Sequence, residues 1–217
     1  MNLLTYLDKE NLDRRLYTYS KINSAITYTT TKNIYPLFAE SYLEFDALHQ
    51  RQFNPDVTFL ETQPLSVYWE DEKGNSHRYS ADIFTEDKDG NLLIEEVKPF
   101  EKYDTKKNRK KFEQIGAAFE AEGAKFIVIT EQDIYQGHNT DNFHLLHRYL
   151  GKSIDSNTLK TINYQASNEM TLGQYLELSD DLHIPSDTIF TMLATHRLMI
   201  DFVEPIRNTI MVNKEVS

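Results

Sequence analysis

The sequence GNLLIEEVKPFEKY, residues 90–103, places two glutamates and a lysine at the end of an apolar run. The run predicts a β-strand over 92–98. Alternate residues of a strand share a face, so Glu96 and Lys98 project together. Glu95 projects from the other face, which we expect to be turned outward.

Hydrophobic periodicity and turn signals predict a series of elements around this strand. Pro36 suits the first turn of a helix, where a missing N–H costs nothing. The pair Asp89-Gly90 is a hairpin signal before the strand. The expected order is α-β-β-β-α-β-α, an α/β fold. Its ranges are a helix at 36–51, strands at 64–70, 77–85 and 92–98, a helix at 105–122, a strand at 125–130 and a helix at 139–150.

After Gly151 the chain becomes polar and rich in Asn and Ser, as in a linker or a short helix. Two helices and two strands then give the outline of a winged-helix module. Residues 171–212 carry two basic and six acidic residues, so contact with protein is at least as well supported as contact with DNA. The expected ranges are helices at 171–179, capped by Thr171, and 184–199, with strands at 199–203 and 208–212.

These patterns divide the 217 residues into three expected parts. Residues 1–35 are an N-terminal extension, and residues 36–150 are the main α/β domain. Residues 151–217 are a linker followed by a small winged-helix-like domain.

Charge is distributed unevenly along the chain. The net charge of −11 argues against a nonspecific nucleic-acid binder, because affinity for phosphate comes from Lys and Arg. Residues 41–100 hold 13 acidic and 5 basic residues, whereas 102–111 hold 6 basic and 1 acidic. This basic segment is either a solvated helix start or a phosphate-facing patch. Its candidates for DNA contact are Lys102, Lys106, Lys107, Arg109 and Lys110.

The composition also excludes several classes of protein and site. The chain has no cysteine, which excludes disulfides and thiolate metal sites and fits a reducing cytoplasm. No window approaches the ~20 apolar residues of a membrane span. Residues 1–20 lack the basic start and long apolar middle of a signal peptide. We therefore expect a cytoplasmic protein that does not contact a membrane.

Three acids can meet near the end of the strand at 92–98. Asp82 lies in an apolar context, and a tight hairpin can bring it near Glu96. Glu44 borders the apolar stripe of the helix at 36–51, with Glu40 as its competitor. Adjacent carboxylates repel and are costly to desolvate, and a divalent cation removes that cost. Mg²⁺ prefers such oxygen ligands.

The chemistry that needs this set, with Lys98 beside it, is metal-assisted phosphodiester hydrolysis. The lysine can orient or help deprotonate the attacking water and can stabilise the developing oxyanion. Asp82 and Glu96, each taken alone, could be ordinary strand-end acids. The combination of Asp82, a short hairpin and Glu96-Val97-Lys98 in this element order argues for a site.

The pattern resembles the restriction-endonuclease-like nucleases, whose PD-(D/E)xK motif lies on an αβββαβ core with a mixed sheet. More closely, the chain resembles TnsA, the endonuclease subunit of heteromeric transposases. The resemblance rests on SYLEFDALHQRQFNPDVTFLETQPL (41–65), YSADIF (79–84) and EEVKPF (95–100). It covers residues 40–150 well and 151–212 in outline. Ala81 stands where the motif name has proline.

The resemblance implies that Glu44, Asp82, Glu96 and Lys98 are catalytic. It implies Mg²⁺, replaceable by Mn²⁺, held by the three carboxylates and the backbone carbonyl of Val97. In the family's best-known form a glutamine matches Glu96, and the acid here follows the wider nuclease motif.

The resemblance further implies a bacterial, cytoplasmic enzyme that cuts the 5′ ends of a transposon. Its partners would be transposon-end DNA, a TnsB-like DDE transposase and a TnsC-like AAA+ ATPase. The length is similar to versions carried by CRISPR-associated transposons. Two other functions stay open: a stand-alone restriction or repair nuclease, and a non-catalytic assembly adaptor.

Overall fold

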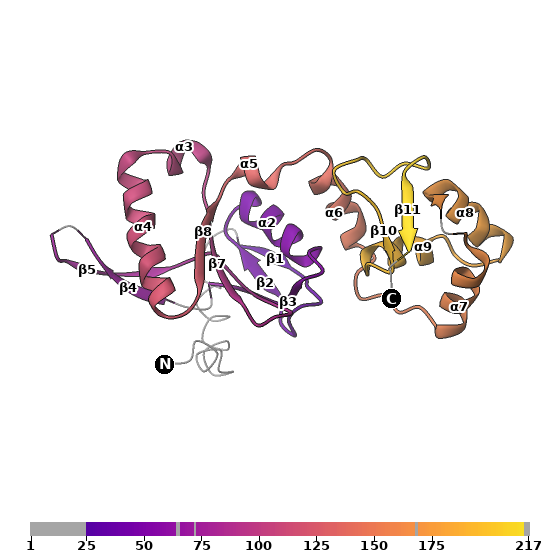
Figure 1. Cartoon of the computed structure of the whole chain (residues 1–217), viewed down its shortest axis with the longest axis horizontal. Coiled ribbons are helices and arrows are strands. Elements are labelled where there is room, and N and C mark those ends of the chain that lie inside the picture. Colours follow the sequence, from indigo (N-terminus) through magenta and orange to yellow (C-terminus); the bar gives the residue numbers. More distant parts are fainter. Residues whose placement is uncertain (1–24, 64–65, 72, 168, 215–217) are drawn as a thin grey trace. The chain divides into compact units, whose positions relative to one another are not determined.

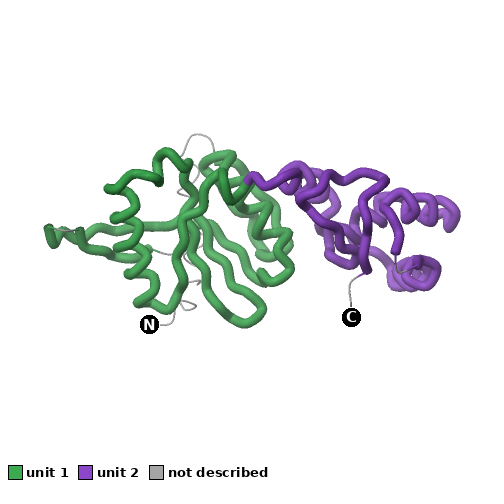
Figure 2. The backbone as a smooth tube through the Cα atoms, turned by 45° about the horizontal axis from the view of Figure 1, so that its top comes forward, with its two compact units in different colours: residues 1–134 green, residues 135–217 purple. Residues whose placement is uncertain are grey.

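A computed structural model describes residues 25–63, 66–71, 73–167 and 169–214. The described residues form two compact units, one ending at Ile134 and the other beginning at Tyr135 (Figure 2). Of the predicted N-terminal extension, residues 1–24 lie outside the described part of the chain. Among the described helices, none combines the length and the hydropathy needed to cross a bilayer.

The first unit is built on a four-stranded mixed sheet in the order β3-β6-β7-β8 (Figure 1). The first two pairs are antiparallel, and β7 pairs with β8 in parallel. The predicted mixed sheet is confirmed. The strands are β3 (Val57–Thr62), β6 (Ile83–Asp87), β7 (Leu92–Val97) and β8 (Lys125–Ile129).

Helices cover both faces of this sheet. On one face lie α2 (Tyr42–Gln52) and the hairpin of β1 (Ile26–Tyr28) and β2 (Leu37–Ala39). On the other lies α4 (Lys106–Ala121), which Thr105 caps at its N-terminus. Successive strand residues point to opposite faces. Ile83 and Val97 therefore pack in the α2 core, while Phe84 and Ile94 pack in the α4 core.

The predicted helix at 36–51 is wrong at its start. Residues 37–39 form strand β2 instead, paired with residues 26–28. The helix begins at Tyr42, because the side chain of Ser41 accepts a hydrogen bond from the Glu44 N–H and caps the first turn.

Two of the predicted strands also need correction. The prediction at 77–85 is in fact two strands, β5 (Ser76–Ser80) and β6, separated at Ala81 and Asp82. Strand β4 (Ser66–Glu70) pairs with β5 as a separate antiparallel ribbon, and residues 64–65 lie outside the described part. The prediction missed strand β3. This strand, and not the one predicted at 64–70, forms the edge of the sheet next to β6.

The connections around β7 follow the turn chemistry. Gly90 has a φ of +79°, and the Asp87 side chain accepts hydrogen bonds from the Asn91 and Asp89 N–H groups, which confirms the hairpin between β6 and β7. After β7 come α3 (Phe100–Tyr103) and α4, and β8 leads into α5 (Glu131–Ile134).

In its described residues, the second unit combines four helices with a three-stranded sheet in the order β10-β11-β9. Thr171 caps α8 as expected, in a capping box with Gln174. The helix predicted at 184–199 ends at Ala194, and the winged-helix assignment stays a prediction. The elements are α6 (Asn139–His147), α7 (Ser156–Gln165), β9 (Met170–Thr171), α8 (Leu172–Asp181), α9 (Asp187–Ala194), β10 (Leu198–Met199) and β11 (Met211–Lys214).

The division between the units differs from the boundary predicted after Leu150. Helix α6 packs against α9 and belongs to the second unit. The helix predicted at 139–150 is also too long, since α6 ends at His147.

Candidate active site

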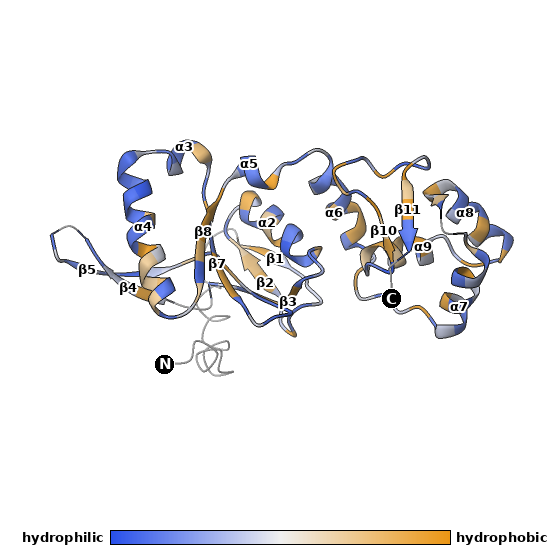
Figure 3. Cartoon of the chain, in the orientation of Figure 1, coloured by the Kyte–Doolittle hydropathy of each residue, from blue (hydrophilic) through white to orange (hydrophobic). Residues whose placement is uncertain are grey.

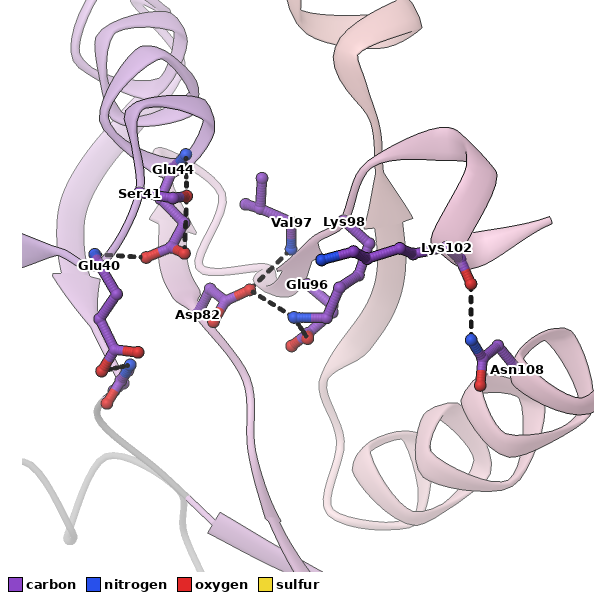
Figure 4. A network of polar contacts seen from close by, with 10 residues as sticks. Glu40, Ser41, Glu44, Asp82, Glu96, Val97, Lys98, Lys102 and Asn108 are labelled. Atoms are coloured by element: carbon purple, nitrogen blue, oxygen red, sulfur yellow. Dashed lines mark hydrogen bonds and ion pairs between the residues drawn. The ribbon is translucent and has the colours of Figure 1, made fainter. Parts of the chain in front are cut away.

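Side chains from three elements surround the C-terminal end of β7 (Figure 4). Glu44 comes from the first turn of α2, Asp82 immediately precedes β6, and Glu96 and Lys98 come from β7 and the residue after it. Because β6 and β7 are antiparallel, the start of one lies beside the end of the other. All four residues predicted to be catalytic therefore belong to the same end of the sheet.

Asp82 is tied to β7 by two hydrogen bonds. Its backbone N–H donates to the Glu95 carbonyl at 3.1 Å. Its Oδ2 accepts from the Val97 N–H at 2.8 Å. The second bond fixes the carboxylate beside the residue that follows Glu96.

Lys98 joins the two strand-end acids. Its Nζ forms an ion pair with Oε1 of Glu96 and lies 3.8 Å from Oδ2 of Asp82. Its backbone N–H donates to the Ile129 carbonyl at 3.0 Å, which extends the pairing with β8. The prediction that Glu96 and Lys98 project together is consistent with this ion pair.

Glu44 is held by the chain just before α2. The Ser41 hydroxyl donates to Oε1 at 2.9 Å, and the Glu40 N–H donates to Oε2 at 2.8 Å. Its competitor Glu40 is exposed, and the Glu40 carboxylate accepts from Nε2 of Gln63 at 3.1 Å. The geometry therefore favours Glu44 as the third acid.

The charges of the four groups act on one another. Burial, then the charge of Glu96, raises the pKa of Asp82 to about 8, with Glu44 adding to the rise. Burial also raises the pKa of Glu44, and the charge of Lys98 opposes this rise. For Lys98, burial works to lower the pKa, but the charges of Asp82 and Glu96 outweigh it and raise the pKa. One cation is thus set among three acids that crowd each other.

The donor set fits a divalent cation. Glu96 is 2% exposed, and within the described chain its Oε2 is buried without a hydrogen-bond partner. Burial, followed by the charge of Glu96, raises the pKa of the neighbouring Tyr79 hydroxyl. A buried, unsatisfied carboxylate oxygen is costly. A hard cation with oxygen ligands would remove that cost.

Glu95 is not turned outward as predicted. It is fully buried, because α2 covers the face of the sheet from which it projects. Arg51 in the last turn of α2 binds it with two groups: Nε donates to Oε2 at 2.5 Å, and Nη2 donates to Oε1. Burial raises the pKa of Glu95, and Arg51 opposes the rise. Of the two adjacent glutamates, Glu96 is the one with a free oxygen.

The five basic residues predicted to contact DNA lie on α3 and the start of α4. All five are exposed, and Figure 3 shows the first half of α4 as strongly hydrophilic. Lys102 extends from α3 toward the acidic cluster in Figure 4. Arg109 is partly neutralised by Asp104, to which its Nε donates at 2.8 Å. Lys111, the sixth basic residue of the segment 102–111, places its Nζ 5.0 Å from the ring centroid of Tyr79.

Comparison with known proteins identifies part of the chain. Residues 54–131 match the family model described as TnsA-like endonuclease N terminal. No curated protein matches the chain. The matched segment contains Asp82, Glu96, Lys98 and the basic residues, whereas Glu44 precedes it. The match confirms the resemblance to TnsA-like endonucleases of the restriction-endonuclease-like fold.

Proposed function

We propose that this chain, whose residues 54–131 form a TnsA-like endonuclease domain, is the nuclease subunit of a transposase and cuts the 5′ ends of the transposon. The observation that supports a metal-dependent nuclease best is the buried, unsatisfied Oε2 of Glu96 beside Asp82 and Lys98. An adaptor without catalysis has no need of such a group.

Glu44, Asp82 and Glu96 would hold Mg²⁺, or Mn²⁺ in its place, together with the backbone carbonyl of Val97. When bound, the ion lowers the pKa of a water molecule and offsets charge on the scissile phosphate. The chain contributes the arrangement of the carboxylates. Ser41 and the Glu40 N–H orient Glu44, and the Val97 N–H orients Asp82.

Lys98 acts as a positive charge at the scissile phosphate. Its ion pair with Glu96 keeps Nζ at the site, and its raised pKa favours the protonated form. A protonated lysine stabilises the oxyanion that forms when water attacks phosphorus. It can also donate a hydrogen bond that orients the attacking water.

The basic segment supplies the DNA contact next to this site. Lys102, Lys106, Lys107, Arg109 and Lys110 would neutralise phosphates flanking the cleaved bond. The net charge of −11 keeps binding by the isolated chain weak. A TnsB-like DDE transposase would cut and join the 3′ ends, and a TnsC-like ATPase would control the assembly, so that recognition of the DNA is shared.

The test is strand-specific cleavage in a reaction reconstituted with both partners and Mg²⁺. We expect Asp82→Asn to lower 5′-end cleavage on the order of 10²- to 10³-fold or more, with 3′-end cleavage retained. Asp89→Asn, the same change in the exposed turn before β7, is the matched control and should cleave normally.

Undiminished 5′-end cleavage by Asp82→Asn would refute the proposed site and favour the adaptor function. Efficient cutting by the chain alone, without either partner, would instead favour a stand-alone restriction or repair nuclease.

A further inference from the structure

The buried ion pair between Arg51 and Glu95 lies next to the candidate site without belonging to it. Glu95 is fully buried, and the Arg51 side chain is 18% exposed. Both oxygens of Glu95 are occupied by the guanidinium, so the pair offers no ligand to a cation. Its contribution must come through the elements that it joins.

Stability alone is a weak reason for such a pair. Removing two charges from water costs about as much as their attraction returns, and well-packed apolar residues are often as stable. What the pair adds is geometry, because two hydrogen bonds from the planar guanidinium, here from Nε and Nη2, restrict the orientation of the carboxylate. A bidentate pair therefore fixes how its two elements are rotated and shifted against each other.

The two elements that it fixes carry opposite walls of the site. Arg51 follows Glu44 by seven residues, about two helical turns, so both lie on the side of α2 that faces the sheet. Glu95 immediately precedes Glu96 in β7. A shift of α2 along or around β7 would move the Glu44 carboxylate relative to that of Glu96.

Neighbouring contacts hold the same end of α2. Nζ of Lys32 donates to the Arg51 carbonyl at 2.8 Å, and Nε2 of Gln50 donates to the Ile134 carbonyl at 2.6 Å. The C-terminal end of α2 is thus fastened, and its N-terminal end presents Glu44.

We propose that Arg51 and Glu95 are a positioning pair that sets the separation of Glu44 and Glu96 and thereby the affinity of the site for a divalent cation. The inference rests on the proposed metal site. It assigns no contact with metal or DNA to either residue.

Three variants of the full chain test the pair. Arg51→Lys keeps the charge but loses the fork. Arg51→Met combined with Glu95→Leu removes both charges and fills the space with apolar groups. The matched control replaces the exposed pair Asp56–Lys88, joined at 2.7 Å, by Asp56→Leu with Lys88→Met, and so removes the same charges elsewhere in the unit.

The measurements are Mn²⁺ affinity, from the EPR signal of free Mn²⁺, and stability, from urea unfolding. We expect the Met/Leu variant to unfold near the wild-type urea midpoint yet to bind Mn²⁺ about tenfold more weakly. Arg51→Lys should also weaken binding, and the control should match the wild type. If the Met/Leu variant does not fold, Arg51→Lys and Glu95→Gln decide the question by the same two measurements.

Wild-type Mn²⁺ affinity in the folded Met/Leu variant would overturn the positioning role and leave the proposed function intact. The proposed function fails separately if the wild type binds no Mn²⁺, or if Glu96→Gln binds it as the wild type does, and the positioning role then fails with it.

Discussion

At the scale of single residues, burial and charge conflict most strongly at Asp82. Its side chain is 13% exposed and lies among the acids Glu96 and Glu44, with Lys98 as the counter-charge. The pKa of Asp82 rises from 3.8 to about 8 as a result. The folded protein without a bound cation therefore favours the protonated carboxyl over a wide pH range.

This shift predicts a pH-dependent stability in EDTA. A carboxyl whose folded pKa is raised stabilises the fold fully below its unfolded pKa, and this stabilisation is lost as pH rises through about 8. We expect the free energy of unfolding to fall between pH 4 and pH 9 by an amount on the order of a few kcal/mol from this group. Urea unfolding at several pH values should show a smaller fall for Asp82→Asn.

Asp89→Asn again provides the control, because it changes an exposed aspartate nearby. The account of Asp82 would be wrong if the Asp82→Asn and Asp89→Asn proteins lost stability equally over that range.

Strand alternation predicted which residues share a face of β7, but it did not predict what covers each face. It placed Glu96 with Lys98, which form an ion pair. It did not reveal that α2 covers the opposite face, so Glu95 was wrongly expected in solvent. The partner of Glu95 is Arg51, which lies 44 residues away along the chain. No local pattern links two residues at that separation.

At the scale of elements, local signals failed where pairing decides the structure. Residues 37–39 have apolar residues at spacings that also suit a helix, but pairing with β1 makes them a strand. The run at 77–85 looks continuous, although β5 pairs with β4 and β6 pairs with β3. The exposed and buried faces of these strands follow from partners that sequence periodicity does not identify. The Thr171 cap and the Asp89-Gly90 turn were predicted correctly, because their chemistry is local.

The Ser41 hydroxyl has two functions at the start of α2, and one substitution removes both. Ser41 accepts from the Glu44 N–H at 3.2 Å and donates to the Glu44 carboxylate at 2.9 Å. We expect Ser41→Ala to cost about 1 kcal/mol of stability and to lower 5′-end cleavage by roughly tenfold, because Glu44 loses an orienting partner. Unfolding and cleavage assays measure the two effects.

Thr171→Ala removes the equivalent cap from α8 in the other unit. It should cost a similar amount of stability with cleavage unchanged. An equal loss of cleavage in both variants would mean that Ser41 acts only through stability.

Two glycines of the second unit should differ in how much stability is lost when each is replaced by alanine. Gly137 has a φ of +54°, and a Cβ there would lie 2.5 Å from the Val203 carbonyl oxygen. Gly151 has a φ of +74° with no atom within 4 Å of an added Cβ. Gly151→Ala should therefore cost only the left-handed strain of about 1 kcal/mol, and Gly137→Ala at least about 2 kcal/mol more. Urea unfolding of the two variants compares the costs, and equal losses would contradict the close packing of this loop on Val203.

At the scale of the whole molecule, the overall charge opposes DNA binding while one segment favours it. The chain carries −11, yet the basic residues concentrate on α3 and the start of α4, directly after Lys98 in the sequence. The sequence predicted a helix over 105–122, and α4 begins within that range, at Lys106. It did not predict that the second unit begins before α6, since the polar stretch after Gly151 looks more like a boundary than residues 134–135 do.

The location of the basic segment predicts a specific change in salt dependence. The logarithm of the binding constant falls as the logarithm of the salt concentration rises. Each phosphate contact that is lost makes this slope shallower by about 0.9. If Lys106 and Lys107 both bind phosphate, Lys106→Gln with Lys107→Gln should reduce the slope by about 2 and weaken binding to transposon-end DNA roughly tenfold near 100 mM salt. Fluorescence anisotropy between 50 and 200 mM salt measures both quantities.

A second pair of exposed lysines separates a local contact from the overall charge. Lys125→Gln with Lys160→Gln changes the net charge equally but alters the start of β8 and the middle of α7. If DNA is bound by the basic residues at the start of α4, this control should keep the wild-type slope, because neither lysine belongs to that segment. Equal slopes for the two double variants would mean that DNA is attracted only by the general charge of the protein, and the basic segment would then be the solvated helix start that the sequence also allowed.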